Sequence, residues 1–177
     1  MTKTIFVSGA NGVGKSTVIP HLINALATDV YEVHDFDERG VPEDAGRTWR
    51  ISETKYWIQR GEELAEKGRV LIICGFVKIE DFDDAKDSLG SDILLILLDA
   101  EQEVIKTRLM ARYTRDGEFE ESQTVIGMPV QKFVENSLYT SRKLRSDWES
   151  AGYPVVETSD LNPTQVAQEV ARIISLS

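Results

Sequence analysis

The chain alternates short, almost wholly apolar runs with longer stretches in which apolar residues recur every three or four positions. The short runs predict strands at Thr4–Ser8, Val30–His34, Arg69–Cys74, Asp92–Leu98 and Tyr153–Glu157. The first, third and fourth runs are nearly all apolar, which is typical of parallel strands that are covered on both faces.

The longer stretches predict helices at Lys15–Ala27, from about Asp44 to Lys67, at Glu101–Tyr113, at Pro129–Ala151, and after Asn162, which acts as N-cap before Pro163. Because strands and helices alternate, we expect an α/β fold with a parallel sheet, formed as one domain over residues 1–177. The segments Asp35–Glu43 and Thr114–Met128 fit neither period. Irregular segments of this length often serve as binding loops or lids.

Composition narrows the class of protein without naming its chemistry. Hydrophobic residues make up 41% and charged residues 28%, as in ordinary soluble domains. No apolar run approaches the roughly 20 residues that cross a bilayer. Together with the absence of a signal-peptide pattern and the single Cys74, this predicts a cytoplasmic protein without membrane association. The net charge of −10 disfavours nucleic acid as a partner and leaves room for one small anion.

The most specific pattern follows the first strand and matches G-x-x-x-x-G-K-[ST]: Gly9-Ala10-Asn11-Gly12-Val13-Gly14-Lys15-Ser16-Thr17. Its glycines allow backbone N–H groups to point inward, so that they and the helix N-terminus bind the β- and γ-phosphates of a nucleotide. Lys15 adds a positive charge near the transferring phosphate, and the Ser16 hydroxyl is placed to ligate Mg²⁺. We therefore assign nucleotide binding to Gly9, Asn11, Gly12, Val13, Gly14, Lys15, Ser16 and Thr17, and a catalytic role to Lys15.

An acidic pair follows the second strand, in Asp35-Phe36-Asp37. Ligands of open α/β sheets bind at the carboxyl edge of the strands, where this pair is expected. Asp35 is the candidate for the metal side. Asp37 is the candidate for the base that takes a proton from a substrate hydroxyl. The two roles could be exchanged, and a solvated acidic loop is the structural alternative.

The glycine-rich loop, the acidic pair and the Cys74-Gly75 end of the third strand resemble the small-molecule kinases of the P-loop class. Shikimate kinase and gluconate kinase are closest in style, and nucleoside monophosphate kinases are more distant. The resemblance implies a three-layer P-loop NTPase fold with a five-stranded parallel sheet of order 2-3-1-4-5. It also implies Mg-ATP as donor, a helical lid over about residues 112–130 and an acceptor-binding region over about residues 35–67.

Arginines precede and follow the predicted lid. Arg112 and Arg115 follow Arg108 by four and seven residues, and all three share one helical face if the helix continues. The resemblance implies that Arg108 stacks on adenine, that Arg112 or Arg115 meets the phosphates during catalysis, and that the loop Thr158–Leu161 wraps the adenine. The alternative is a solubilising helix face that pairs with nearby acids.

Candidate acceptor contacts lie elsewhere. Arg50 and Arg47, near the start of the second helix, could hold an acceptor carboxylate or phosphate, and Arg142 on a later helix could reach the acceptor. The neighbouring Trp49 and Trp57 could stack on a ring, although aromatic residues at helical spacing are usually core.

These features predict transfer of the γ-phosphate of Mg-ATP to a hydroxyl or phosphate of a small metabolite, nucleoside or nucleotide, by a monomer or homodimer. A regulatory or hydrolysing NTPase without such an acceptor is the alternative. No acidic residue ends the third strand, where many P-loop ATPases carry one, and this argues against a motor ATPase. Asp99, after the fourth strand, is expected to cap the next helix.

Overall fold

The computed structural model describes residues 4–86, 92–113, 124–125 and 127–176. Its main sheet consists of the parallel strands β1 (Thr4–Ser8), β2 (Tyr31–Asp35), β3 (Val70–Cys74), β4 (Ile93–Asp99) and β7 (Val155–Glu157). The strand order is β2-β3-β1-β4-β7, which confirms the predicted order with β7 as the fifth strand of the sheet.

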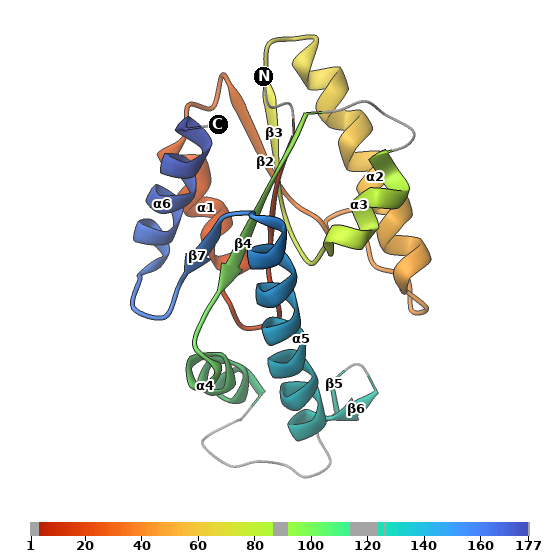
Figure 1. Cartoon of the computed structure of the whole chain (residues 1–177), viewed down its shortest axis with the longest axis vertical. Helices are drawn as coiled ribbons and strands as arrows, with labels where there is room; N and C mark the ends of the chain where they lie inside the picture. Colours follow the sequence, from red (N-terminus) through yellow and green to blue (C-terminus); the bar gives the residue numbers. More distant parts are fainter. Residues whose placement is uncertain (1–3, 87–91, 114–123, 126, 177) are drawn as a thin grey trace.

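Helices flank the sheet on both sides (Figure 1). Helices α1 (Lys15–Ala25) and α6 (Pro163–Ser175) pack together on one side, and α2 (Arg47–Ala65) and α3 (Ile79–Lys86) pack together on the other. Helix α5 (Val130–Ala151) contacts β4 and β7, and α4 (Gln102–Tyr113) packs against α5. This is the predicted α/β architecture.

The core lies between the sheet and its helices because β1 and β3 present only buried residues. Trp148, Phe6 and Phe36 are its largest fully buried side chains. Helix α2 approaches β1 closely at Gly61, where an added Cβ would lie 1.9 Å from the Thr4 Oγ1. Only glycine allows this helix-to-strand spacing.

The predicted last helix begins as expected. The Asn162 side chain accepts a hydrogen bond from the Gln165 backbone N at 3.0 Å, and the Gln165 Oε1 accepts one from the Asn162 N at 2.9 Å. This reciprocal capping box satisfies two backbone donors of the first turn, with Pro163 at the first helical position.

Some elements differ from the sequence-based expectation. Helix α3 was not predicted, because half of its eight residues are acidic and they are too few to show a helical pattern. The segment Thr114–Met128, expected to be irregular, contains β5 (Thr124–Val125), which pairs antiparallel with β6 (Met128–Pro129). Most of the predicted lid at residues 112–130 lies outside the described residues. Within those that are described, no helix combines the length and apolarity needed to span a membrane.

Candidate active site

The loop between β1 and α1 has the backbone geometry that its glycines predict. Gly12 and Gly14 have φ angles of 86° and 107°, a backbone region that residues other than glycine rarely adopt. An added Cβ at Gly9 would lie 2.6 Å from both the Leu98 carbonyl oxygen and the Val13 Cγ2. Helix α1 starts directly after Gly14, so the free N–H groups of its first turn are available to an anion.

Lys15 lies inside this loop. Its Nζ donates a hydrogen bond to the Ala10 carbonyl oxygen at 2.8 Å. Burial lowers the pKa of Lys15 to about 8, while the nearby carboxylates of Asp37 and Asp35 act in the opposite direction. A phosphate oxygen at this position would replace the carbonyl as the partner of the ammonium group and favour its charged form.

The acidic pair at the end of β2 divides into one fixed and one free carboxylate. The Asp35 Oδ2 accepts a hydrogen bond from the Ser16 Oγ at 3.4 Å, and its Oδ1 accepts one from the Asp37 backbone N at 2.9 Å. The Asp37 side chain makes no hydrogen bond within the part of the chain that the structure describes. Partial burial raises the pKa of Asp37, and the Asp35 carboxylate raises it further.

Phe36, between the two acids, fixes their position. Its backbone N donates to the Cys74 carbonyl oxygen at 2.9 Å, and its own carbonyl accepts from the Trp57 Nε1 at 3.3 Å. Its ring meets Trp49 edge-on, with centroids 5.7 Å apart. Gly75, which directly follows the neighbouring strand β3, leaves room for this ring, because an added Cβ would lie 2.1 Å from the Phe36 Cβ. Trp57 is therefore a core residue that supports the acidic pair.

A small cavity of about 120 Å³ joins the glycine-rich loop to the acidic pair. Its lining includes Lys15, Ser16, Asp35, Asp37, Cys74, Gly75, Phe76 and Arg112. Burial raises the pKa of the Cys74 thiol to about 12, so this side chain stays protonated and is a poor nucleophile at neutral pH.

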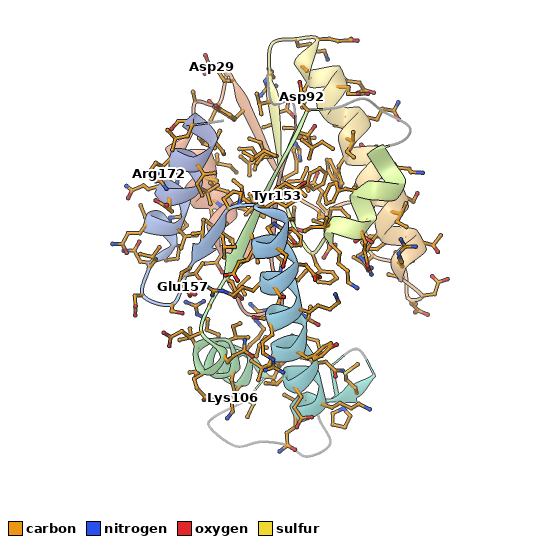
Figure 2. The ribbon with its side chains drawn as sticks, in the orientation of Figure 1. Asp29, Asp92, Lys106, Tyr153, Glu157 and Arg172 are labelled. Carbon is orange, nitrogen blue, oxygen red and sulfur yellow. The ribbon has the colours of Figure 1, made fainter. Side chains whose placement is uncertain are left out.

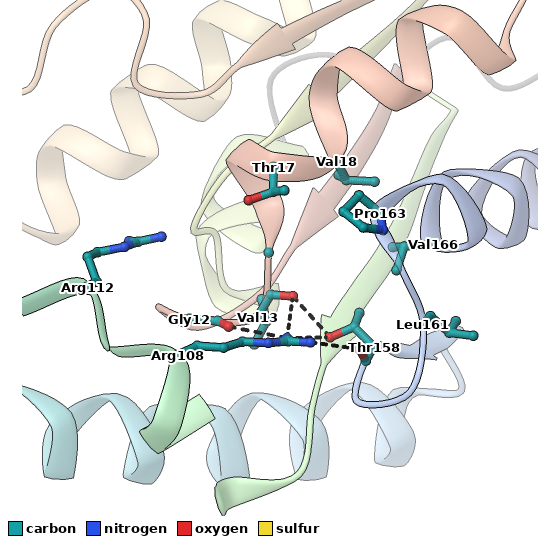
Figure 3. A pocket seen from close by; sticks show the side chains of 11 residues that line it. Gly12, Val13, Thr17, Val18, Arg108, Arg112, Thr158, Leu161, Pro163 and Val166 are labelled. Atoms are coloured by element: carbon teal, nitrogen blue, oxygen red, sulfur yellow. Dashed lines mark hydrogen bonds between the residues drawn. The ribbon is translucent and has the colours of Figure 1, made fainter. Parts of the chain in front are cut away.

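A larger cavity of about 340 Å³ borders the same loop (Figure 3). It shares Gly12, Gly14, Thr17 and Arg112 with the smaller cavity. Its remaining lining comes from the loop, α1, α4, the segment after β7 and α6: Val13, Val18, Arg108, Thr158, Leu161, Pro163 and Val166. The two cavities therefore meet at the glycine-rich loop.

Arg108 forms a fixed wall of the larger cavity (Figure 3). Its Nη2 donates to the Thr158 carbonyl oxygen at 2.9 Å, and its Nη1 donates to the Thr158 Oγ1 at 3.1 Å and to the Gly12 carbonyl oxygen at 3.4 Å. The Thr158 hydroxyl in turn donates to the Val13 carbonyl oxygen at 3.1 Å. These bonds connect α4, the end of β7 and the glycine-rich loop. The sequence indicated the loop after β7 but not the role of the Thr158 side chain.

The other predicted arginines have different surroundings. Arg112 is exposed and lines both cavities, whereas Arg115 lies outside the described residues. Arg47 is exposed at the first position of α2. The Arg142 Nη1 donates to the Gln102 Oε1 at 2.8 Å, on the surface between α5 and α4, and Arg142 lines neither cavity.

Arg50 is engaged by a buried acid. Its Nε donates to the Asp81 Oδ2 at 3.1 Å, and its Nη2 lies 3.5 Å from the Asp81 Oδ1. The guanidinium carbon lies 5.4 Å from the ring centroid of Phe76, which lines the smaller cavity. Asp81 belongs to α3, the helix that the sequence did not predict, so this pairing could not be anticipated.

Asp99 is not the helix cap that the sequence suggested. It is the buried last residue of β4, and it accepts hydrogen bonds from the Ser141 Oγ at 2.7 Å and the Arg145 Nη1 at 3.2 Å. Arg145 also donates to Glu157 at 2.9 Å. Glu157 is the last residue of β7 (Figure 2). Helix α4 begins only at Gln102, so Asp99 instead attaches α5 to the sheet.

Comparison with solved structures gives the same fold over the whole chain. A sugar kinase from Janibacter sp. HTCC2649 matches with a TM-score of 0.60 and 18% identity, covering 100% of this chain and 96% of its own. Shikimate kinase from Acinetobacter baumannii, in complex with shikimate, matches with a TM-score of 0.61 and 18% identity, covering 99% of this chain and 94% of its own.

The APS kinase CysC of Mycobacterium tuberculosis, in complex with AMPPNP and APS, matches with a TM-score of 0.60 and 19% identity, covering 98% of both chains. No protein-family model and no curated protein matches this sequence. At these identities the likeness establishes the fold, which is that of the small P-loop kinases.

Proposed function

We propose that this protein transfers the γ-phosphate of ATP to a small-molecule acceptor. The observation that supports this most is the smaller cavity, which places the anion-binding loop and Lys15 beside the unbonded carboxylate of Asp37. A phosphate-binding loop and a proton acceptor within one cavity are what a phosphotransferase needs. The fold shared with kinases of known structure is consistent with this reaction.

The phosphates and the base of the nucleotide would bind in different places. The residues Gly9, Asn11, Gly12, Val13, Gly14, Lys15, Ser16 and Thr17 would hold the phosphates through backbone N–H groups and the ammonium group. The base would lie in the larger cavity, against the planar guanidinium of Arg108. Arg112, which lines both cavities, would meet the phosphates, and Arg115 remains a second candidate for that role.

Ser16 and Asp35 fit a magnesium site. Their side-chain oxygens lie 3.4 Å apart at the edge of the phosphate cavity, and hydroxyl and carboxylate oxygens are ligands that Mg²⁺ prefers. When bound there, Mg²⁺ would neutralise phosphate charge and orient the transferring group. Asp35 is the better candidate for this role because Ser16 already contacts it, which leaves Asp37 free to act as a base.

In the transfer step, the Asp37 carboxylate would accept a hydrogen bond from the acceptor hydroxyl and then take its proton. The acceptor oxygen would form a bond to the γ-phosphorus while the bond between that phosphorus and the β–γ bridging oxygen breaks, and ADP would leave. Lys15 and Arg112 would stabilise the negative charge on the transferring group. Acceptor contacts of Arg50, Arg47 and Arg142 stay predictions; Arg50 is already paired with Asp81, and Arg142 lines neither cavity.

The test is ADP release from ATP with and without a panel of sugars, nucleosides, nucleotides and amino alcohols. Asp37→Asn should retain ATP binding by calorimetry and lose acceptor phosphorylation by about 100-fold or more. Asp44→Asn is the matched control, because it removes an exposed carboxylate from the same segment. Acceptor-independent hydrolysis that survives Asp37→Asn would instead support a hydrolysing NTPase.

A further inference from the structure

Three positively charged side chains in or near the predicted acceptor-binding region have carboxylate partners. Arg50 pairs with Asp81 at 3.1 Å, Arg39 with Glu53 at 3.1 Å, and Lys78 with Glu80 at 3.2 Å. Arg47, at the start of α2, is also not without a partner. Residues 35–82, which contain all of these groups, belong to the part of the chain that the structure describes.

The pair of Arg50 and Asp81 is the one closest to the reacting groups, since Arg50 lies over Phe76 in the cavity wall. The Asp81 side chain is fully buried, and it also accepts a hydrogen bond from the Lys78 backbone N at 3.0 Å. Only 16% of the Arg50 side chain is exposed. Withdrawing Arg50 toward an acceptor anion would leave the buried Asp81 carboxylate without its counter-charge, which is strongly unfavourable.

The negative charges nearest the acceptor are not neutralised in this way. The Asp37 carboxylate has no hydrogen-bonding partner among the described residues, and Asp35 is bonded only to a hydroxyl and a backbone N–H. Lys15 and Arg112 lie on the phosphate side, where a triphosphate would use their charge. An acceptor carboxylate or phosphate next to the reacting hydroxyl would therefore meet like charge. Among the described residues that line this cavity, it would have to compete with the triphosphate for Lys15 and Arg112.

We propose that the acceptor is an alcohol without an anionic group, either an uncharged polyhydroxy compound or an amino alcohol, and that phosphate is transferred to its hydroxyl. This inference rests on the proposed kinase function and narrows its substrate class. It excludes nucleoside monophosphates, sugar phosphates and hydroxy acids as preferred acceptors. The free carboxylate of Asp37 suits hydroxyl and ammonium donors, which an anion cannot provide.

Matched acceptors that differ in charge test the proposal. Ribose is compared with ribose 5-phosphate, glucose with gluconate and with glucosamine, and adenosine with AMP, by kcat/KM at fixed ATP. The uncharged or cationic member should be preferred by at least about tenfold. Preference for the anionic member would overturn this inference and leave the kinase function standing. Phosphorylation of none of them would refute the kinase function itself.

Asp81→Asn tests the role of the ion pair. The amide keeps the shape of the side chain and can still accept from the Lys78 N, but it leaves Arg50 with an unbalanced positive charge. The ratio of kcat/KM values should shift toward the anionic acceptor by about tenfold or more. Glu63→Gln, which removes an exposed carboxylate that pairs with Arg60 elsewhere on α2, should leave the ratio unchanged.

A second variant covers the case in which Asp81→Asn does not fold. The double change Arg50→Gln and Asp81→Asn replaces the ion pair by a neutral pair of similar size, which proteins often tolerate. The preference for uncharged acceptors should persist in it. If Arg50 were an anion ligand, this variant would instead lose activity selectively on the anionic acceptors, and the proposal would fail.

Discussion

Gly75→Ala should lower the turnover of the proposed kinase and leave its affinity for ATP nearly unchanged. An added Cβ would lie 2.1 Å from the Phe36 Cβ, about 1.3 Å short of ordinary contact, and 2.9 Å from the Phe36 Cγ. Phe36 cannot rotate away freely, because it is fully buried and its backbone is bonded on both sides. The backbone between Asp35 and Asp37 must therefore move by about 1 Å.

A displacement of that size has two measurable effects. Misplacement of a catalytic group by about 1 Å can lower turnover roughly 100-fold, so kcat should fall by about two orders of magnitude. Overpacking of the core should cost about 1–3 kcal/mol, which lowers the melting temperature of a chain of this size by roughly 2–12 °C. The Kd for ATP should change less than about threefold, because Phe36 lines neither of the two cavities that border the phosphate-binding loop.

Gly46→Ala is the matched control. Its added Cβ would find no atom closer than the Asp44 carbonyl oxygen at 3.8 Å, and its φ of −133° is open to any residue. Wild-type turnover and melting temperature in Gly75→Ala would refute the idea that Phe36 positions the acids. Loss of ATP binding together with turnover would show that the disturbance reaches the loop through the Gly75 N, which bonds the Val7 carbonyl oxygen at 3.1 Å.

Three further measurements address other parts of the structure. Burial lowers the pKa of Lys15 to about 8, and a triphosphate needs the charged form of this side chain, so ATP affinity by calorimetry should fall about twofold at pH 8 and tenfold at pH 9 relative to pH 7. Lys15→Arg should flatten this pH profile, and an identical profile in both proteins would contradict the assignment. Thr158→Val removes two hydrogen bonds around Arg108 and should raise the Kd for ATP about 5- to 30-fold; an unchanged Kd would show that the Arg108 wall does not depend on them. Gly61→Ala should destabilise the fold by about 1–3 kcal/mol in urea titration, and Thr4→Ala should relieve part of this; a fully stable single variant would disprove the close contact between α2 and β1.

The parts of the protein that the sequence predicted are those specified by neighbouring residues. The motif Gly9–Thr17 carries its own backbone geometry, and the apolar runs define β1, β3 and β4 to within a residue. The start of α6 was predicted for the same reason, since Asn162 and Pro163 act within one helical turn.

The parts that the sequence did not predict depend on contacts between distant residues. Arg50 meets Asp81 31 positions later, on a helix whose acidic sequence reads as a loop. Thr158 reaches Val13 across 145 positions, and Asp99 meets Ser141 and Arg145 rather than its own helix. Hydrophobic period and motif spacing contain no information about such pairs.

The wall of the larger cavity has a consequence for the order in which the proposed nucleotide site forms during synthesis. Gly12 and Val13 are made early, but the Thr158, Leu161 and Pro163 that complete the cavity belong to the last strand and helix. A ribosome-bound chain that stops before Thr158 contains the whole Gly9–Thr17 motif but lacks one wall of this cavity. Tight nucleotide binding should therefore begin only after Thr158 and the lining residues that follow it have been made.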